Sequence, residues 1–175
     1  RPNNLFTADF GMRLDWNQID ARKYYYKRDW LTRGYASVYS NFITRTLITE
    51  ILTRSKFDFL TLSFTAGVQA TVSKALTLQF NLNHSERTPN SAELFSDGLH
   101  HSLASIEYGN LGLDSESSNK LLAGITYQNK WVTLNLTPHF ARIKNFIQLQ
   151  PSGLKQTVRG AFPVWSYIAQ NADFY

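Results

Sequence analysis

Strict alternation of apolar and polar residues is the feature that most limits how this chain can fold. Within residues 5–16 every even position from Phe6 to Trp16 is apolar, whereas the odd positions are mostly polar or small. The same alternation recurs in residues 60–72, 76–85, 121–127 and 132–140, and less regularly in 165–175. Side chains on a strand point to opposite faces in turn, so each segment is predicted to be a strand with one apolar and one polar face.

The connections between these predicted strands alternate between short and long. Residues 73–74 and 129–130 form tight links, whereas residues 17–56, 86–119 and 150–164 form long ones. Structureless connections beyond about 12–15 residues are uncommon in compact soluble domains. Because the long connections fall at every second position, all three are expected to project from the same end of the sheet.

An alternating antiparallel sheet has two architectures open to it. A soluble β-sandwich would bury the apolar faces between two sheets, and an outer-membrane barrel would turn them toward lipid. Three features favour the barrel: the asymmetry of the connections, alternation over about 10 residues, and Trp16, Trp131 and Trp165 at strand ends, where the membrane interface lies. The predicted fold is therefore all-β, an antiparallel meander of about six strands forming part of a transmembrane barrel, since complete single-chain barrels start at about eight.

Composition excludes several classes of function. The chain has no cysteine, which removes disulfide and zinc–thiolate chemistry. It contains no apolar run of about 18 residues, so no transmembrane helix is expected. It begins at Arg1 without a signal segment, which suggests a piece of a longer polypeptide. The net charge of +5 is concentrated in residues 20–33, which indicates a basic loop rather than a nucleic-acid interface. No catalytic constellation stands out, so an enzyme is not expected and no cofactor is predicted.

The polar stretch between the third and fourth predicted strands carries a family resemblance. It contains Arg87-Thr88-Pro89, then Glu93-Leu94-Phe95, then Gly109-Asn110, Leu113 and Glu116-Ser117-Ser118. In this order and spacing the segment resembles the barrel domain of TonB-dependent outer-membrane receptors. The ending FPVWSYIAQNADFY is similar to the same family, and the arrangement of strands and loops extends the resemblance over the whole chain.

The resemblance implies a barrel of about 22 strands filled by an N-terminal plug. Residues 1–175 would then be part of the barrel domain, with the plug and the remaining strands outside them. It further implies a receptor in the outer membrane of a Gram-negative bacterium, coupled to the TonB complex through the missing N-terminal region. The ligand class would be a scarce iron–siderophore or other metal chelate, haem or a vitamin. A porin-like passive barrel and a soluble β-sandwich binding module are the alternative functions.

Two groups of residues are predicted to have distinct roles in the loops. Some motif residues are expected to organise the base of the second long loop rather than to bind substrate: Arg87, Pro89, Glu93, Leu94, Gly109, Asn110 and Glu116. The first long loop interleaves cations and aromatic rings, which suit an anionic, ring-bearing ligand. Its predicted ligand-binding residues are Arg22, Lys23, Tyr24, Tyr25, Tyr26, Lys27 and Arg28, and contact with the anionic lipid surface is the alternative.

A metal site is a weaker prediction. His100 and His101, with Asp97 nearby, contain suitable ligand atoms. Adjacent residues on a strand point in opposite directions, so both imidazoles can reach one ion only within a turn. Solvated or loop-packing histidines are the alternative.

Overall fold

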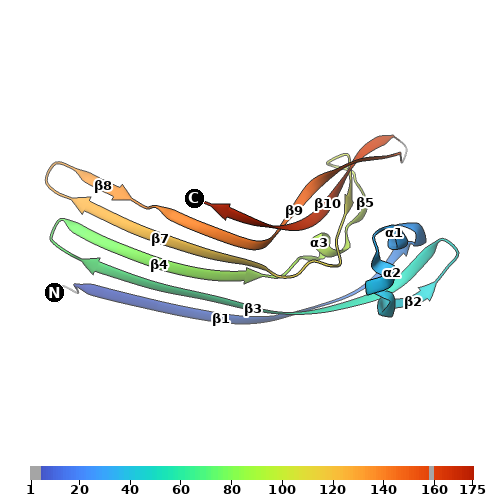
Figure 1. The fold of residues 1–175 in the computed structure, drawn as a ribbon, viewed down its shortest axis with the longest axis horizontal. Coiled ribbons are helices and arrows are strands. Elements are labelled where there is room, and N and C mark those ends of the chain that lie inside the picture. Colours follow the sequence, from blue (N-terminus) through green and yellow to red (C-terminus); the bar gives the residue numbers. More distant parts are fainter. Residues whose placement is uncertain (1–4, 158–159) are drawn as a thin grey trace.

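The computed structural model describes residues 5–157 and 160–175, which form one curved, largely antiparallel sheet (Figure 1). Six long strands follow one another through the sheet in chain order, β1-β3-β4-β7-β9-β10. This confirms the predicted meander and rules out two face-packed sheets. The long strands are β1 (Phe6–Tyr26), β3 (Glu50–Thr71), β4 (Leu76–Arg87), β7 (Glu116–Gln128), β9 (His139–Thr157) and β10 (Ala161–Phe174).

The remaining elements are short and belong mainly to the long connections. The first connection contains two helical turns, a 3₁₀ turn and a strand, and the second contains a helical turn and a hairpin whose strand β6 pairs parallel to β10. None of the helices in the described ranges is long and apolar enough to cross a membrane. These elements are α1 (Lys27–Thr32), α2 (Tyr35–Val38), η1 (Ser40–Phe42), β2 (Ile43–Thr46), α3 (Ser91–Phe95), β5 (Asp97–His100), β6 (Ser105–Tyr108) and β8 (Thr133–Leu136).

The turns and the long connections lie at opposite ends of the sheet, as predicted. Figure 1 shows the β3–β4 and β7–β8 turns together at the left and the helical turns at the right. The β7–β8 turn is closed by Asn129, whose side-chain Oδ1 accepts from the backbone N–H groups of Trp131 and Val132 at 2.8 Å each. We refer below to the turn end and the loop end.

Two of the three predicted long loops are instead mostly strand. Residues 17–26 continue β1 and residues 50–56 continue β3, so the first loop shrinks to residues 27–49. The third predicted loop, 150–164, is an extended hairpin, because β9 runs to Thr157 and β10 begins at Ala161; residues 158 and 159 lie outside the described ranges. Residues 132–140 are also not one strand: β8 ends before Pro138, which has no N–H for the ladder, and β9 begins after it.

The β1–β3 pair exchanges its apolar and polar faces just beyond Trp16 and Leu60, which are opposite one another in register. We call the face carrying the even residues of β1 the outer face. On the turn side of Trp16 this face is apolar and exposed, with Phe10 73% and Trp16 66% accessible. On the loop side it becomes polar, and Gln18 donates to Asp58 at 2.7 Å. An apolar outer face suits contact with lipid, and a polar outer face suits contact with water. The level of Trp16 and Leu60 therefore marks the edge of the apolar, lipid-facing band.

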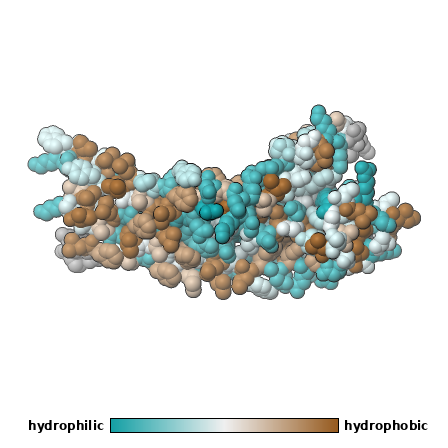
Figure 2. All heavy atoms as spheres, in the orientation of Figure 1, coloured by the Kyte–Doolittle hydropathy of each residue, from teal (hydrophilic) through white to brown (hydrophobic). Residues whose placement is uncertain are grey.

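The inner face changes in the opposite sense at the same level. On the turn side it carries polar residues such as Arg13 and Asp15, whose charged groups lie 2.6 Å apart. On the loop side it becomes apolar, because the long connections fold back onto it and bury Tyr25, Trp30 and Ile51. Figure 2 shows hydrophobic residues dominating the turn-side half and hydrophilic ones denser toward the middle and the loop end.

Candidate functional site

The base of the second connection is held by one cation between two acids. Arg87, the last residue of β4, donates from Nη1 to both carboxylate oxygens of Glu93 at 3.1 Å and from Nη2 to Glu116 Oε2 at 3.0 Å. Burial lowers the pKa of Arg87, but the hydrogen bonds and charges of Glu93 and Glu116 outweigh it and leave the pKa raised. Glu116 also accepts from the N–H of Ile147 at 3.0 Å, which ties the loop base to β9.

Helix α3 begins at a capping box directly above this charge group. The Asn90 side chain accepts from the N–H of Glu93 at 2.9 Å, and the Glu93 carboxylate accepts from the N–H of Asn90 at 2.8 Å. Glu93 therefore joins the helix start to Arg87, and Leu94 behind it is 1% exposed. Such a cap is worth about 1 kcal/mol to a helix end.

Gly109 lets two parts of the second connection approach closely. A Cβ on Gly109 would lie 2.6 Å from the backbone carbonyl carbon and oxygen of Leu94. The Gly109 N–H donates to Ser96 O at 2.6 Å, and the Asn110 N–H donates to Glu93 O at 2.8 Å. The segment after β6 is thereby fixed against α3.

The first connection packs onto the second through tyrosine hydroxyl groups. Tyr35 Oη donates to Gly109 O and accepts from the N–H of Leu111, both at 3.3 Å. Tyr39 donates to Leu111 O at 2.8 Å. Beneath them, Tyr25 and Trp30 are 1% and 0% exposed, with ring centres 5.3 Å apart. The two connections, 27–49 and 88–115, therefore form one body on the inner face.

Charge also joins the two connections. Arg33 donates from Nη2 to Asp97 Oδ1 at 2.9 Å, and its guanidinium lies 4.0 Å from the ring centre of Tyr108. Lys23 Nζ is 4.0 Å from Asp97 Oδ2 and donates to the Phe95 carbonyl. Burial raises the pKa of Asp97, partly offset by Arg33 and Lys23, and burial lowers the pKa of Lys23 despite Asp97.

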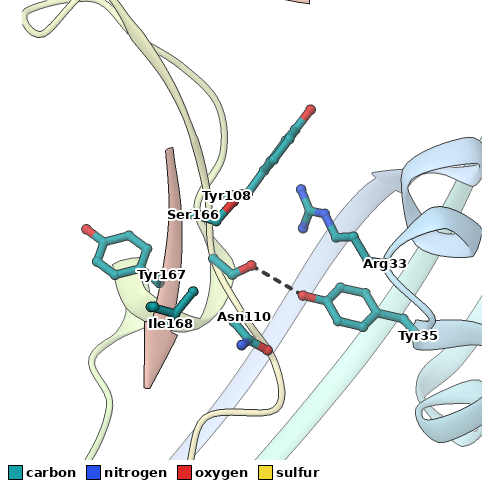
Figure 3. A pocket seen from close by; sticks show the side chains of 8 residues that line it. Arg33, Tyr35, Tyr108, Asn110, Ser166, Tyr167 and Ile168 are labelled. Carbon is teal, nitrogen blue, oxygen red and sulfur yellow. Dashed lines mark hydrogen bonds between the residues drawn. The ribbon is translucent and has the colours of Figure 1, made fainter. Parts of the chain in front are cut away.

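A hollow of about 280 Å³ opens beside this contact, where both connections meet β10. Figure 3 shows Arg33, Tyr35 and Tyr108 on one side of it and Tyr167 and Ile168 of β10 on the other, with the hydrogen bond from Tyr35 to Gly109 drawn. It combines a guanidinium with phenol rings, groups that bind anions and flat conjugated ligands. We call it the mouth hollow.

The comparisons with known proteins agree with this architecture. The family model for the TonB dependent receptor-like β-barrel matches residues 1–173. The chain belongs to this family. A solved structure with the same fold is a double mutant of the Serratia marcescens hemophore receptor HasR in complex with its hemophore HasA and heme, at a TM-score of 0.61 and 19% identity. The match covers 98% of this chain and 28% of the HasR chain, and no curated protein matches.

Family membership fixes the orientation of this receptor barrel. Proteins of this family are receptors and transporters of the Gram-negative outer membrane rather than enzymes. In such barrels the short turns are periplasmic and the long loops extracellular. The mouth hollow therefore lies at the extracellular end, on the inner side.

The structure separates the seven predicted ligand-binding residues of the receptor barrel into three groups. Lys23 and Tyr25 face inward and are used in packing, so Tyr25, 1% exposed, presents nothing to a ligand. Arg22 and Tyr24 lie on the outer face of β1. Tyr26, Lys27 and Arg28 line a second hollow of about 490 Å³ at the hairpin tip, together with Asp29, Leu31, Ile48 and Thr49.

The motif residues of the receptor family lie together, and two of the predicted metal ligands, Asp97 and His100, are engaged by other side chains. The seven motif residues from Arg87 to Glu116 gather around α3, with Pro89 fully buried, although a role limited to structure stays a prediction. Asp97 is engaged by Arg33, and His100 Nδ1 lies 2.8 Å from Glu107 Oε1. Within residues 5–157 and 160–175 no three acidic or histidine side chains form a metal-binding group.

Sequence reasoning missed the residues of the mouth hollow. Arg33 and Tyr35 follow the basic run that was selected, and they come to the hollow because Gly34, at φ +71°, turns the chain between α1 and α2. Tyr108 directly precedes the motif glycine Gly109, and that adjacency to a close backbone approach was the available signal.

Proposed function

We propose that this chain is part of an outer-membrane receptor that takes up an anionic metal chelate with aromatic or conjugated groups by TonB-coupled active transport. The proposal extends to a larger barrel than residues 1–175, to a plug domain, and to contact with the TonB complex through a region outside these residues. An iron–siderophore or haem fits this class; the HasR structure named above holds heme.

The mouth hollow carries the proposal. Its Arg33 guanidinium, which is paired with Asp97 through Nη2, and the ring and hydroxyl group of Tyr108 line it at the extracellular end of the inner wall. Burial raises the pKa of Tyr108, so its hydroxyl group stays protonated and can donate to an anionic ligand at neutral pH. A passive porin-like pore would have no need of a mouth filled by two mutually packed connections.

The hollow at the hairpin tip, lined by Tyr26, Lys27 and Arg28, is proposed to contact the ligand before the mouth hollow does. Lys27 and Arg28 begin α1, and both are exposed. Exposed cation–aromatic contacts are worth only about 0.5–1 kcal/mol each, so this group would concentrate ligand rather than hold it. Transfer from the tip to the mouth would follow the inner side of the hairpin.

The test is binding of ferric chelates and haem to the full-length receptor. Tyr108→Leu removes a hollow-lining hydroxyl group and ring while leaving the Arg33–Asp97 ion pair intact, and we expect it to weaken binding of the cognate chelate about 10-fold. Tyr127→Leu, at the turn end, is the matched control. Unchanged affinity for every chelate in Tyr108→Leu would remove the mouth hollow from the binding site.

A further inference from the structure

The guanidinium of Arg33 lies at the mouth hollow but is already held by a carboxylate. Its Nη2 donates to Asp97 Oδ1 at 2.9 Å, and the two side chains are 13% and 8% exposed. The ring centre of Tyr108 lies 4.0 Å from the guanidinium carbon, and Figure 3 shows both residues at the hollow. Because the opposite charges of the pair largely cancel, Arg33 offers an incoming anion little net attraction while Asp97 holds it.

The two partners of this ion pair line different hollows. Arg33 lines the mouth hollow, whereas Asp97 lines a neighbouring hollow of about 410 Å³ together with His100 and Glu107. A ligand in the mouth hollow therefore reaches Arg33 from a side that Asp97 does not occupy. A guanidinium has five N–H donors in a planar fork, so a second carboxylate can begin to bind before the first has left.

Lys23 gives Asp97 a second cation on its other carboxylate oxygen. Lys23 Nζ lies 4.0 Å from Asp97 Oδ2, whereas Arg33 donates to Oδ1, and Lys23 also donates to the Phe95 carbonyl. A buried carboxylate left without any cation is strongly destabilising. Since Lys23 stays beside Asp97 when Arg33 turns to a ligand, the exchange leaves Asp97 with a cation.

We propose that Asp97 determines the specificity of the mouth hollow, because a ligand must carry a carboxylate or similar anionic group that displaces Asp97 from Arg33. The inference rests on the function proposed above and adds to it the residue that distinguishes an anionic chelate from an uncharged one. While Asp97 holds Arg33, the apparent affinity is reduced by the fraction of receptor in which Arg33 is free. A chelate without a free anionic group gains nothing from the exchange.

The experiment measures chelate binding to the full-length receptor in detergent. Haem and ferric citrate carry free carboxylates, and haem dimethyl ester is the matched probe in which the carboxylates of haem are blocked. The variants are Asp97→Asn, which keeps a side-chain oxygen and removes the charge, Arg33→Gln, and the two together. Asp20→Asn is the control, because it removes a carboxylate that accepts from Arg54 at 2.7 Å on the outer face of the same hairpin.

We expect Asp97→Asn to bind haem or ferric citrate, whichever the parent binds, about 10-fold more tightly than the parent does. Its affinity for haem dimethyl ester should be unchanged. In the Arg33→Gln background Asp97→Asn should give no gain, because the cation that it would release is absent. Asp20→Asn should match the parent with every probe.

Equal or weaker binding of both carboxylate probes to Asp97→Asn would overturn the inference. So would a gain that persists without Arg33 or that extends to the ester, because Asp97 would then act as a general negative charge and not through Arg33. If Tyr108→Leu weakens chelate binding while Asp97→Asn does not strengthen it, the proposed function stands and the inference falls. If neither carboxylate probe binds the parent or Asp97→Asn, the inference falls and the proposed function is left with chelates that have no carboxylate.

Discussion

Arg33 and Asp97 lie 64 residues apart in the chain, and their side chains meet at 2.9 Å between the first and second long connections. Both are largely buried, at 13% and 8% side-chain exposure. Lys23 lies on the far carboxylate oxygen of Asp97 and Tyr108 under the guanidinium of Arg33. The contact therefore couples the two connections to each other and to the edge of the mouth hollow.

Removing the cation of this pair should loosen the joined connections. Arg33→Gln leaves the buried Asp97 carboxylate with only Lys23 at 4.0 Å, and we expect a cost of about 1–3 kcal/mol, confined to the loop end. Amide hydrogen exchange in residues 27–49 and 96–110 should accelerate. Arg13→Gln, which breaks the exposed pair with Asp15 on the inner wall, is the control and should leave these amides unchanged.

Removing both charges should cost less than removing the cation alone. In Arg33→Gln/Asp97→Asn the buried carboxylate is removed together with its cation, and Lys23 keeps its hydrogen bond to the Phe95 carbonyl, so part of the protection lost in Arg33→Gln should return. Additive effects of the two substitutions on exchange would show that the two side chains do not interact.

Acid should not release this contact through Asp97. Its pKa is raised chiefly by burial, above the usual 3.8, so the folded loop end takes up a proton more readily than the unfolded chain does. The stability that this group contributes is therefore complete below 3.8 and is lost as pH rises through the raised pKa. The difference in stability between the parent and Asp97→Asn can be measured by exchange of the same amides between about pH 4 and 7. This difference should move in favour of the parent as pH falls. A shift in the opposite direction would contradict the burial of Asp97.

Gly109 should tolerate no side chain. In Gly109→Ala the new Cβ would meet the Leu94 backbone at 2.6 Å, which cannot rotate away, so α3 or the segment after β6 must move. Overpacking of this kind costs about 1–3 kcal/mol. Gly112→Ala, in the same connection, meets only side-chain atoms, Asn110 Oδ1 at 3.2 Å and Tyr39 Oη at 3.5 Å, and is the matched control. We expect faster exchange of the α3 amides and weaker chelate binding in the first variant alone.

Sequence reasoning succeeded where a strand keeps one apolar face and failed where that face changes. Residues 5–16 and 60–72 were predicted to be strands because their even positions stay apolar. Beyond Trp16 the alternation continues in the opposite phase, with Ile19 and Tyr25 inward and Gln18 and Asp20 outward. A pattern in which only the even positions are apolar ends at Trp16. Residues 17–26 and 50–56, at the loop end of the hairpin, were therefore predicted to be loop.

The candidate site depended on contacts that no local pattern encodes. The loop-base charges around Arg87 were predictable because a family motif names them. The mouth hollow joins Arg33, Tyr108 and Tyr167 from three separate segments, and β6 reaches β10 by a parallel pairing that skips β7 and β9. Only the folded arrangement brings those residues together.

The change of face at Trp16 also predicts how arginine substitutions depend on position. Phe10 lies on the outer face about 15 Å below the edge of the apolar band, near the bilayer midplane, so Phe10→Arg should cost about 2–4 kcal/mol. Gln18 is on the same face just above that edge, and Gln18→Arg should cost about 0–1 kcal/mol. Asn81→Arg is the inner-face control, because Asn81 and Asp9 flank Gly67 from either side and Asp9 would pair with the new cation. Urea unfolding of the full-length receptor in lipid vesicles measures all three. Equal costs for Phe10→Arg and Gln18→Arg would mean that the outer face does not meet lipid where the exchange of faces places it.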